Sequence, residues 1–110
     1  MELTRSEQSF LLDSLLEMGD LLLDSGAEIS RVEDTLARVG KAYGAARMDV
    51  FVIPSIISIS MEFPASDSLT ETRRIHSNGL NDFYRLEKLN SLSRSCCQAP
   101  PPLGDLRAAL

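Results

Sequence analysis

Within residues 25–54 the spacing between apolar residues changes once. This change limits the possible folds more than any other feature of the chain. In the first half, apolar residues recur at helical spacing, which predicts a helix over residues 28–43. Gly44 follows it, and glycine can end a helix there because it adopts a positive φ without strain. Residues 47–53 then place their side chains in two alternating rows, which is typical of a strand. A helix with an apolar face that is followed directly by a strand indicates a helix packed on a sheet.

An earlier helix is predicted over residues 5–24, with Ser6 as its N-cap. Its leucines cover more than the single face that an amphipathic helix needs, so we expect it to be buried on two sides. The sheet would cover one side, and a second helix or another copy of the chain would cover the other. Its acidic side chains are interpreted as a solvated face: Asp13, Glu17, Asp20 and Asp24.

Two more strands and a third long helix are predicted after residue 53. Residues 56–63 alternate cleanly, and the Pro54-Ser55 turn before them favours a hairpin. Residues 68–76 are predicted as an edge strand. Residues 80–95 have helical spacing, with Ser77 or Asn81 as the N-cap. The order ααβββα predicts an α+β two-layer sandwich, in which helices pack on one face of a mainly antiparallel three-stranded sheet.

The chain has 110 residues, and we expect one soluble domain over residues 1–98. Residues 99–110 are interpreted as a proline-rich segment and the start of a further helix, which leads toward a membrane region absent from this sequence. No signal peptide is expected. The longest apolar stretch, residues 50–61, is interrupted by Pro54 and is much shorter than the roughly 20 residues of a membrane helix.

Charge and cysteine usage exclude several classes of function. The net charge of −5 argues against nucleic acid as a partner, because phosphate binding needs clustered Lys and Arg, and no polybasic run suggests anionic lipid. Cys96 and Cys97 are adjacent, a spacing that rarely forms a disulfide, so we expect reduced thiols. No metal site and no cofactor are predicted, since His76 has no second ligand at metal spacing.

Two groups of arginines are candidates for binding a ligand. Arg31, Thr35 and Arg38 lie on one stripe of the second predicted helix, where they could bind an anion or form ion pairs with Glu28 and Asp34.

Arg73 and Arg74 are adjacent on a strand and must leave opposite faces. The one beneath the helices needs an acid or an anion, because an unpaired buried charge is costly. Glu33 and Asp49 are the predicted acidic partners, and a structural ion pair is favoured over a binding site.

A hydrolytic site is the enzymatic alternative. Its members would be a serine from Ser55, Ser58 or Ser60, with His76 as the base and Asp49 as the orienting acid. No GxSxG motif surrounds any of these serines, so we predict no catalytic residue and no enzyme. The serine face of the second strand is open to two interpretations, as solvent-exposed surface or as the polar wall of a site.

Several short motifs resemble, in order, the N-terminal domain of the threonine/serine exporter family of membrane proteins. They are SGA (25–27), RVEDT (31–35), AYG (42–44), DVF (49–51), TRRI (72–75) and LNSLSR (89–94). The resemblance covers about residues 20–110, with Ser55 where a threonine is expected. The positions that match the family pattern are Ser25, Gly26, Arg31, Glu33, Thr35, Arg38, Tyr43, Asp49, Pro54, Thr72, Arg73, Asn90 and Arg94.

The resemblance implies a cytosolic domain, at the inner face of the cell membrane, of an exporter of threonine and serine or of small carboxylates. Its role would be assembly or regulation; the alternative is a small-ligand-binding or hydrolytic domain beside the transport path. The implied partners are the membrane-embedded half of the transporter, in the same or a partner chain, a second copy of this chain and a small polar substrate. The candidate ligand-binding residues are Arg31, Glu33, Thr35, Arg38, Asp49, Ser55, Arg73 and Arg74.

Overall fold

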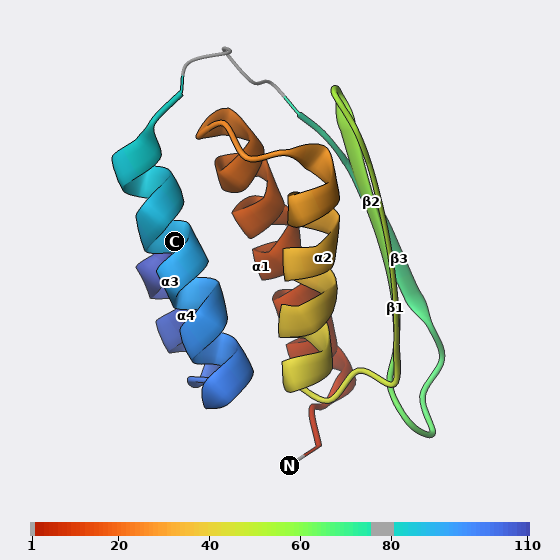
Figure 1. Ribbon diagram of the computed structural model, residues 1–110. Coiled ribbons are helices and arrows are strands. Elements are labelled where there is room, and N and C mark those ends of the chain that lie inside the picture. The colour runs from red at the N-terminus through yellow and green to blue at the C-terminus, as the bar shows by residue number, and fades with distance from the viewer. Residues whose placement is uncertain (1, 76–80) are drawn as a thin grey trace.

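The computed structural model describes residues 2–75 and 81–110. Its three strands form an antiparallel sheet in the order β1-β2-β3, and its helices all lie on one face of that sheet (Figure 1). The predicted α+β fold and the order ααβββα are confirmed. The elements are α1 (Arg5–Asp24), α2 (Ile29–Ala42), β1 (Arg47–Ile53), β2 (Ile56–Glu62), β3 (Leu69–Arg74), α3 (Phe83–Gln98) and α4 (Leu103–Ala109).

The helices are arranged in two tiers above the sheet. α1 and α2 pack directly on the strands, whereas α3 packs on α2 and α1, and α4 packs on α1 (Figure 1). α1 is therefore covered by the sheet on one side and by helices of the same chain on the other. This arrangement buries most of its leucines, as the sequence predicts, and Leu11, Leu15 and Leu16 have no exposed surface.

The inner face of the sheet supplies the other half of the core. Ile57, Ile59 and Met61 of β2 are buried at alternate positions along the strand, on the face that packs against α1. The opposite face is open, and Phe51 of β1 is 59% exposed there. Ser60 on this open face hydrogen-bonds Thr70 across the β2–β3 pair at 2.7 Å. Burial on one face only explains the alternating pattern of the sequence.

Several predicted ends are wrong by a few residues. α1 begins with Thr4 as its N-cap instead of Ser6, because Thr4 and Glu7 form a reciprocal capping box. α3 begins at Phe83 with Asp82 as its N-cap, and Asp82 accepts a hydrogen bond from the Arg85 amide at 3.0 Å. The strand predicted over residues 68–76 is shorter, Leu69–Arg74; Ser77 and His76 lie outside the described residues. The predicted stop at Gly44 is confirmed by its φ of 107°.

The C-terminal residues fold back onto the domain. Leu106 of α4 is fully buried, and the Tyr43 hydroxyl donates a hydrogen bond of 2.6 Å to the carbonyl oxygen of Pro101. Residues 103–109 therefore share the core of the other helices, while the predicted boundary after residue 98 stays a prediction. Within residues 2–75 and 81–110, no helix combines the length and the apolar character needed to cross a membrane.

Gly19 allows α1 to approach both β2 and α2 closely. A Cβ added at this position would lie 2.9 Å from the Cδ1 atoms of Ile57 and Leu36, whereas one added at Gly104 would meet no atom within 4 Å. Because overpacking a core is costly, Gly19→Leu should lower the free energy of unfolding by about 1–3 kcal/mol. Gly104→Leu should not lower it, because the added side chain has open space and leucine has a higher helix propensity than glycine. Urea denaturation followed by circular dichroism would measure both, and equal effects would contradict the packing described here.

Candidate functional site

The eight residues predicted to bind a ligand do not converge on one place. Arg31, Thr35 and Arg38 lie on the side of α2 that faces α3. The other five are distributed over the sheet and its edges. Glu33 contacts the edge of β1, Ser55 lies in the β1–β2 turn, Asp49 and Arg74 are exposed, and Arg73 reaches toward α1. A single site built from all eight is therefore excluded by the fold.

The groove between α2 and α3 brings three of the predicted residues together with new ones. It consists of two adjoining hollows of about 250 and 200 Å³, which share Arg31, Thr35 and Asn90. The first hollow continues toward the apolar side chains of Leu22, Ala27, Val32 and Leu86. The second is polar and is lined by Arg31, Asp34, Thr35, Arg38, Asn90, Ser93 and Arg94. The groove thus has an apolar end and a cationic end.

The arginines of the groove differ in their pairing. Arg38 forms the predicted ion pair with Asp34, one turn away, with 2.9 Å between Nε and Oδ2. The alternative pairing of Arg31 with Glu28 does not occur. Within the described residues, neither Arg31 nor Arg94 forms an ion pair or a side-chain hydrogen bond. Two guanidinium groups beside this groove are therefore available to a ligand.

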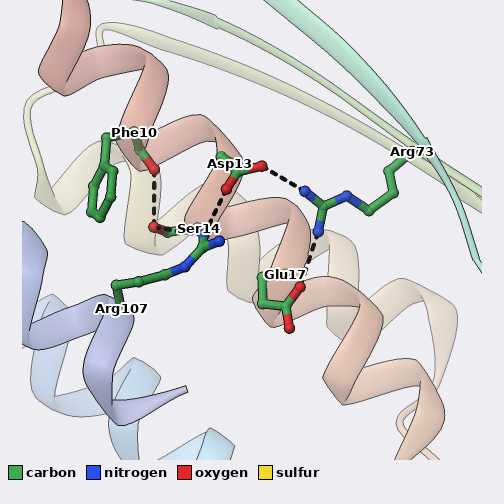
Figure 2. A network of polar contacts seen from close by, with 6 residues as sticks. All are labelled: Phe10, Asp13, Ser14, Glu17, Arg73 and Arg107. Carbon is green, nitrogen blue, oxygen red and sulfur yellow. Dashed lines mark hydrogen bonds and ion pairs between the residues drawn. The ribbon is translucent and has the colours of Figure 1, made fainter.

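Arg73 is held by α1, so the prediction of Glu33 or Asp49 as its partner is wrong. Its guanidinium donates to Asp13 at 2.6 Å and to Glu17 at 3.1 Å (Figure 2). Arg73 pairs with Ile57 across the strands and shares its inward side, which directs it under the first helix. The predicted structural ion pair is thus present with different acids, and Asp13 and Glu17 are not the solvated face that the sequence suggested.

Asp13 also binds the C-terminal helix. Arg107 of α4 approaches it from the side opposite Arg73, with 2.8 Å between Nη1 and Oδ2 (Figure 2). The same guanidinium lies 5.8 Å from the centre of the Phe10 ring, within the range of a cation–π contact. One carboxylate therefore links α1, β3 and α4. Asp24, also predicted as solvated, accepts a hydrogen bond of 2.6 Å from Arg85 of α3.

Glu33 binds a backbone amide at the β1 edge of the sheet. Its Oε2 accepts a hydrogen bond of 3.0 Å from the backbone amide of Val52, which points away from β2. An unpaired amide at a sheet edge needs such a partner when water is excluded. Glu33 thus has a structural contact, although the sequence placed it among the ligand-binding candidates. Asp49 likewise has an ion pair on the exposed surface, with Arg47 at 3.3 Å.

The serines proposed for hydrolysis do not form a nucleophilic group in the described residues. Ser58 and Ser60 hydrogen-bond Thr72 and Thr70 on the open face of the sheet. Ser55 is exposed in the hairpin turn, where its carbonyl oxygen accepts from the Ile75 amide at 2.8 Å. His76 lies outside the described residues. The serine row of β2 therefore forms cross-strand hydrogen bonds, which stabilise the sheet pairing.

Tyr43 and Cys96 form a small polar contact near the end of α2. Burial raises the pKa of the Tyr43 hydroxyl above its ordinary range, and the neighbouring Cys96 adds to the shift. Burial also raises the pKa of the Cys96 thiol. Both cysteines are free, as predicted, with Cys96 buried and Cys97 exposed. Since the thiolate is the reactive form of cysteine, Cys96 is not set up as a nucleophile at neutral pH. Within the described residues, no group of three or more His, Cys, Asp or Glu could hold a metal ion.

Sequence reasoning missed the contribution of α3 to the groove. Asn90 and Arg94 match the family pattern in LNSLSR, but they are far from Arg31 in the sequence, and only the packing of α3 on α2 brings them together. Asp13 and Glu17 carried a weak signal, because acids one turn apart on a helix present two carboxylates to one guanidinium fork. No periodicity indicated which helix would lie over Arg73.

The different environments of Arg73 and Arg74 give a matched pair of variants. Arg73→Met removes two ion pairs that are partly shielded from water, and should lower the free energy of unfolding by about 1 kcal/mol. Arg74→Met, on the exposed face, should change it by less than about 0.5 kcal/mol. Thermal denaturation would measure the difference, which should shrink at high salt because the pairs are partly exposed. Equal melting temperatures for the two variants would show that the Arg73 network does not stabilise the fold.

Comparison with known proteins identifies the family. The family model described as "Putative threonine/serine exporter" matches residues 13–110, which include the α2–α3 groove and every residue of the Arg73 and Arg107 ion pairs. No curated protein and no solved structure matches the chain. The match covers far more than half of the sequence and agrees with the motifs quoted above. The chain belongs to the threonine/serine exporter family.

Proposed function

We propose that this chain is the cytosolic domain of a transmembrane exporter of threonine and serine or of small carboxylates. The observation that carries the proposal is the family match over residues 13–110. In this proposal the transport path belongs to a membrane-embedded half, in the same or a partner chain. The domain would lie at the cytosolic face of the cell membrane and act in assembly or regulation.

The attachment of α4 supports a role in assembly. Leu106 is fully buried, and Arg107 is held by Asp13, so α4 is fixed to the same helix that also binds β3 through Arg73. A membrane segment joined after α4 would be coupled to the domain by these contacts instead of by a loose linker. A second copy of the chain remains the expected soluble partner. Since Leu11, Leu15 and Leu16 of α1 are buried within the chain, we expect that copy to contact a different surface.

Export by cells that express the complete gene tests this function. We expect expression to raise the release of threonine, serine or a small carboxylate such as succinate from preloaded cells. Deleting residues 1–110 should lower that release, with the amount of membrane-inserted protein measured in parallel. Unchanged release after the deletion would contradict a role in assembly or regulation. The absence of export from the intact gene, for all three substrates, would contradict the exporter assignment itself.

The second candidate is a small-ligand-binding domain beside the transport path, and the α2–α3 groove favours it. The hydrolytic form of this alternative has less support, because Ser58 and Ser60 are engaged in cross-strand hydrogen bonds. Calorimetry of the 110-residue chain with threonine, serine and succinate separates the candidates. Heat from any one supports ligand binding. No heat from all three, together with a dimer in light scattering, supports assembly.

A further inference from the structure

We propose that the groove between α2 and α3 binds a small organic oxyanion, in which a phosphate or carboxylate group is attached to a short apolar chain. The charged group would lie at the cationic end, between Arg31 of α2 and Arg94 of α3, and the apolar chain would extend toward Leu22 and Leu86. This inference deepens the ligand-binding function proposed above by naming the class of ligand and the residues that hold it.

The local charge of the groove opposes the charge of the whole chain. The protein carries a net charge of −5, yet Arg31, Arg38 and Arg94 line the polar hollow, where Asp34 is the acidic lining residue. Asp34 is engaged by Arg38, and Glu28, which lines the adjoining hollow, forms no ion pair with Arg31, so the lining keeps a net positive charge with its cationic excess in the polar hollow. An arginine fork matches the oxygens of carboxylate and phosphate, because its donors lie in one plane at a fixed spacing. The excess of arginine in the polar hollow therefore favours an oxyanion over a neutral ligand.

Neutral donors lie beside the two arginines. Thr35 and Asn90 line both hollows and are partly buried, and their side chains have no hydrogen-bond partner within the described residues. Ser93 is different, because its hydroxyl donates to the carbonyl oxygen of Asn90 at 2.8 Å. Thr35 and Asn90 can thus donate to oxygens that the guanidinium groups leave open. Donors from two helices that are distant in sequence would hold one ligand between them.

The apolar end of the groove favours a ligand that also carries an apolar group. Leu22, Ala27, Val32 and Leu86 line the first hollow together with Glu28, and this hollow adjoins the cationic end at Arg31. Transfer of hydrocarbon from water to such a surface is favourable in proportion to the area buried. Inorganic phosphate would use only the cationic end, whereas an anion with a short alkyl chain would use both. The ligand is therefore expected to be amphiphilic.

Binding of simple probes to the 110-residue chain tests the site. Calorimetry at constant ionic strength would use inorganic phosphate, n-butyl phosphate and pentanoate. We expect n-butyl phosphate to bind about tenfold more tightly than inorganic phosphate, because its chain reaches the apolar hollow. Comparison with pentanoate shows whether the charged group is a phosphate or a carboxylate, and binding of either amphiphile supports the site. If neither binds, the proposal is wrong.

Variants locate the binding in the groove. Arg31→Gln and Arg94→Gln should each weaken binding about tenfold, since each removes a charge-assisted contact. Asp34→Asn should strengthen it about threefold, because it frees Arg38 and removes the opposing charge. Lys41→Gln, an exposed residue of α2 outside the groove lining, removes the same charge and should leave the affinity unchanged.

Equal weakening by Lys41→Gln and Arg31→Gln would show that anions respond only to net charge, and would overturn the site. Urea denaturation of each variant verifies that the fold is retained. The outcome is separable from the export test. If the groove binds none of the probes, the complete gene can still export threonine, and only the binding proposal is wrong.

Discussion

α1 carries apolar side chains around most of its circumference, and such a helix is stable in water only when both sides are covered. The sheet covers one side and cannot cover the other, so α3 and α4 must pack behind it. This requirement explains why the helices form two tiers on a single face of the sheet. The groove between α2 and α3 also results from this arrangement. α3 packs on α1 and α2, and the hollows lie where the surfaces of α2 and α3 meet.

The ion pairs of Asp13 act on top of this apolar packing. Arg73 from the sheet and Arg107 from α4 meet one carboxylate on α1, and Glu17 accepts the second arm of the Arg73 fork. The side chains are between about a quarter and two fifths exposed, so solvent weakens each attraction. They also bring β3 and α4 to one point of α1, because Arg73 and Arg107 bind the same carboxylate.

The elements with a clear period could be predicted from the sequence, and the contacts between distant elements could not. Residues 47–53 matched β1 because alternation there reports burial on one face. For α4 the sequence predicts only the start of a helix. Its seven residues after three prolines contain too few turns to show an apolar stripe. The spacing of Arg31, Thr35 and Arg38 alone predicted that they share one stripe of α2, where they could bind an anion. Arg94 joined them only through the packing of α3, on which periodicity carries no information.

The hydrogen bond from the Val52 amide to Glu33 has a consequence for how the sheet meets other polypeptides. A sheet with unpaired edge strands can pair with a strand of another chain, which is a route to fibrils and to unwanted self-association. At β1 an incoming strand would have to displace a carboxylate that already occupies the amide, and would meet the body of α2 beside it. Growth of the sheet is therefore obstructed at its β1 border by a side chain, and at the other border β3 is short and charged, two features that discourage strand addition.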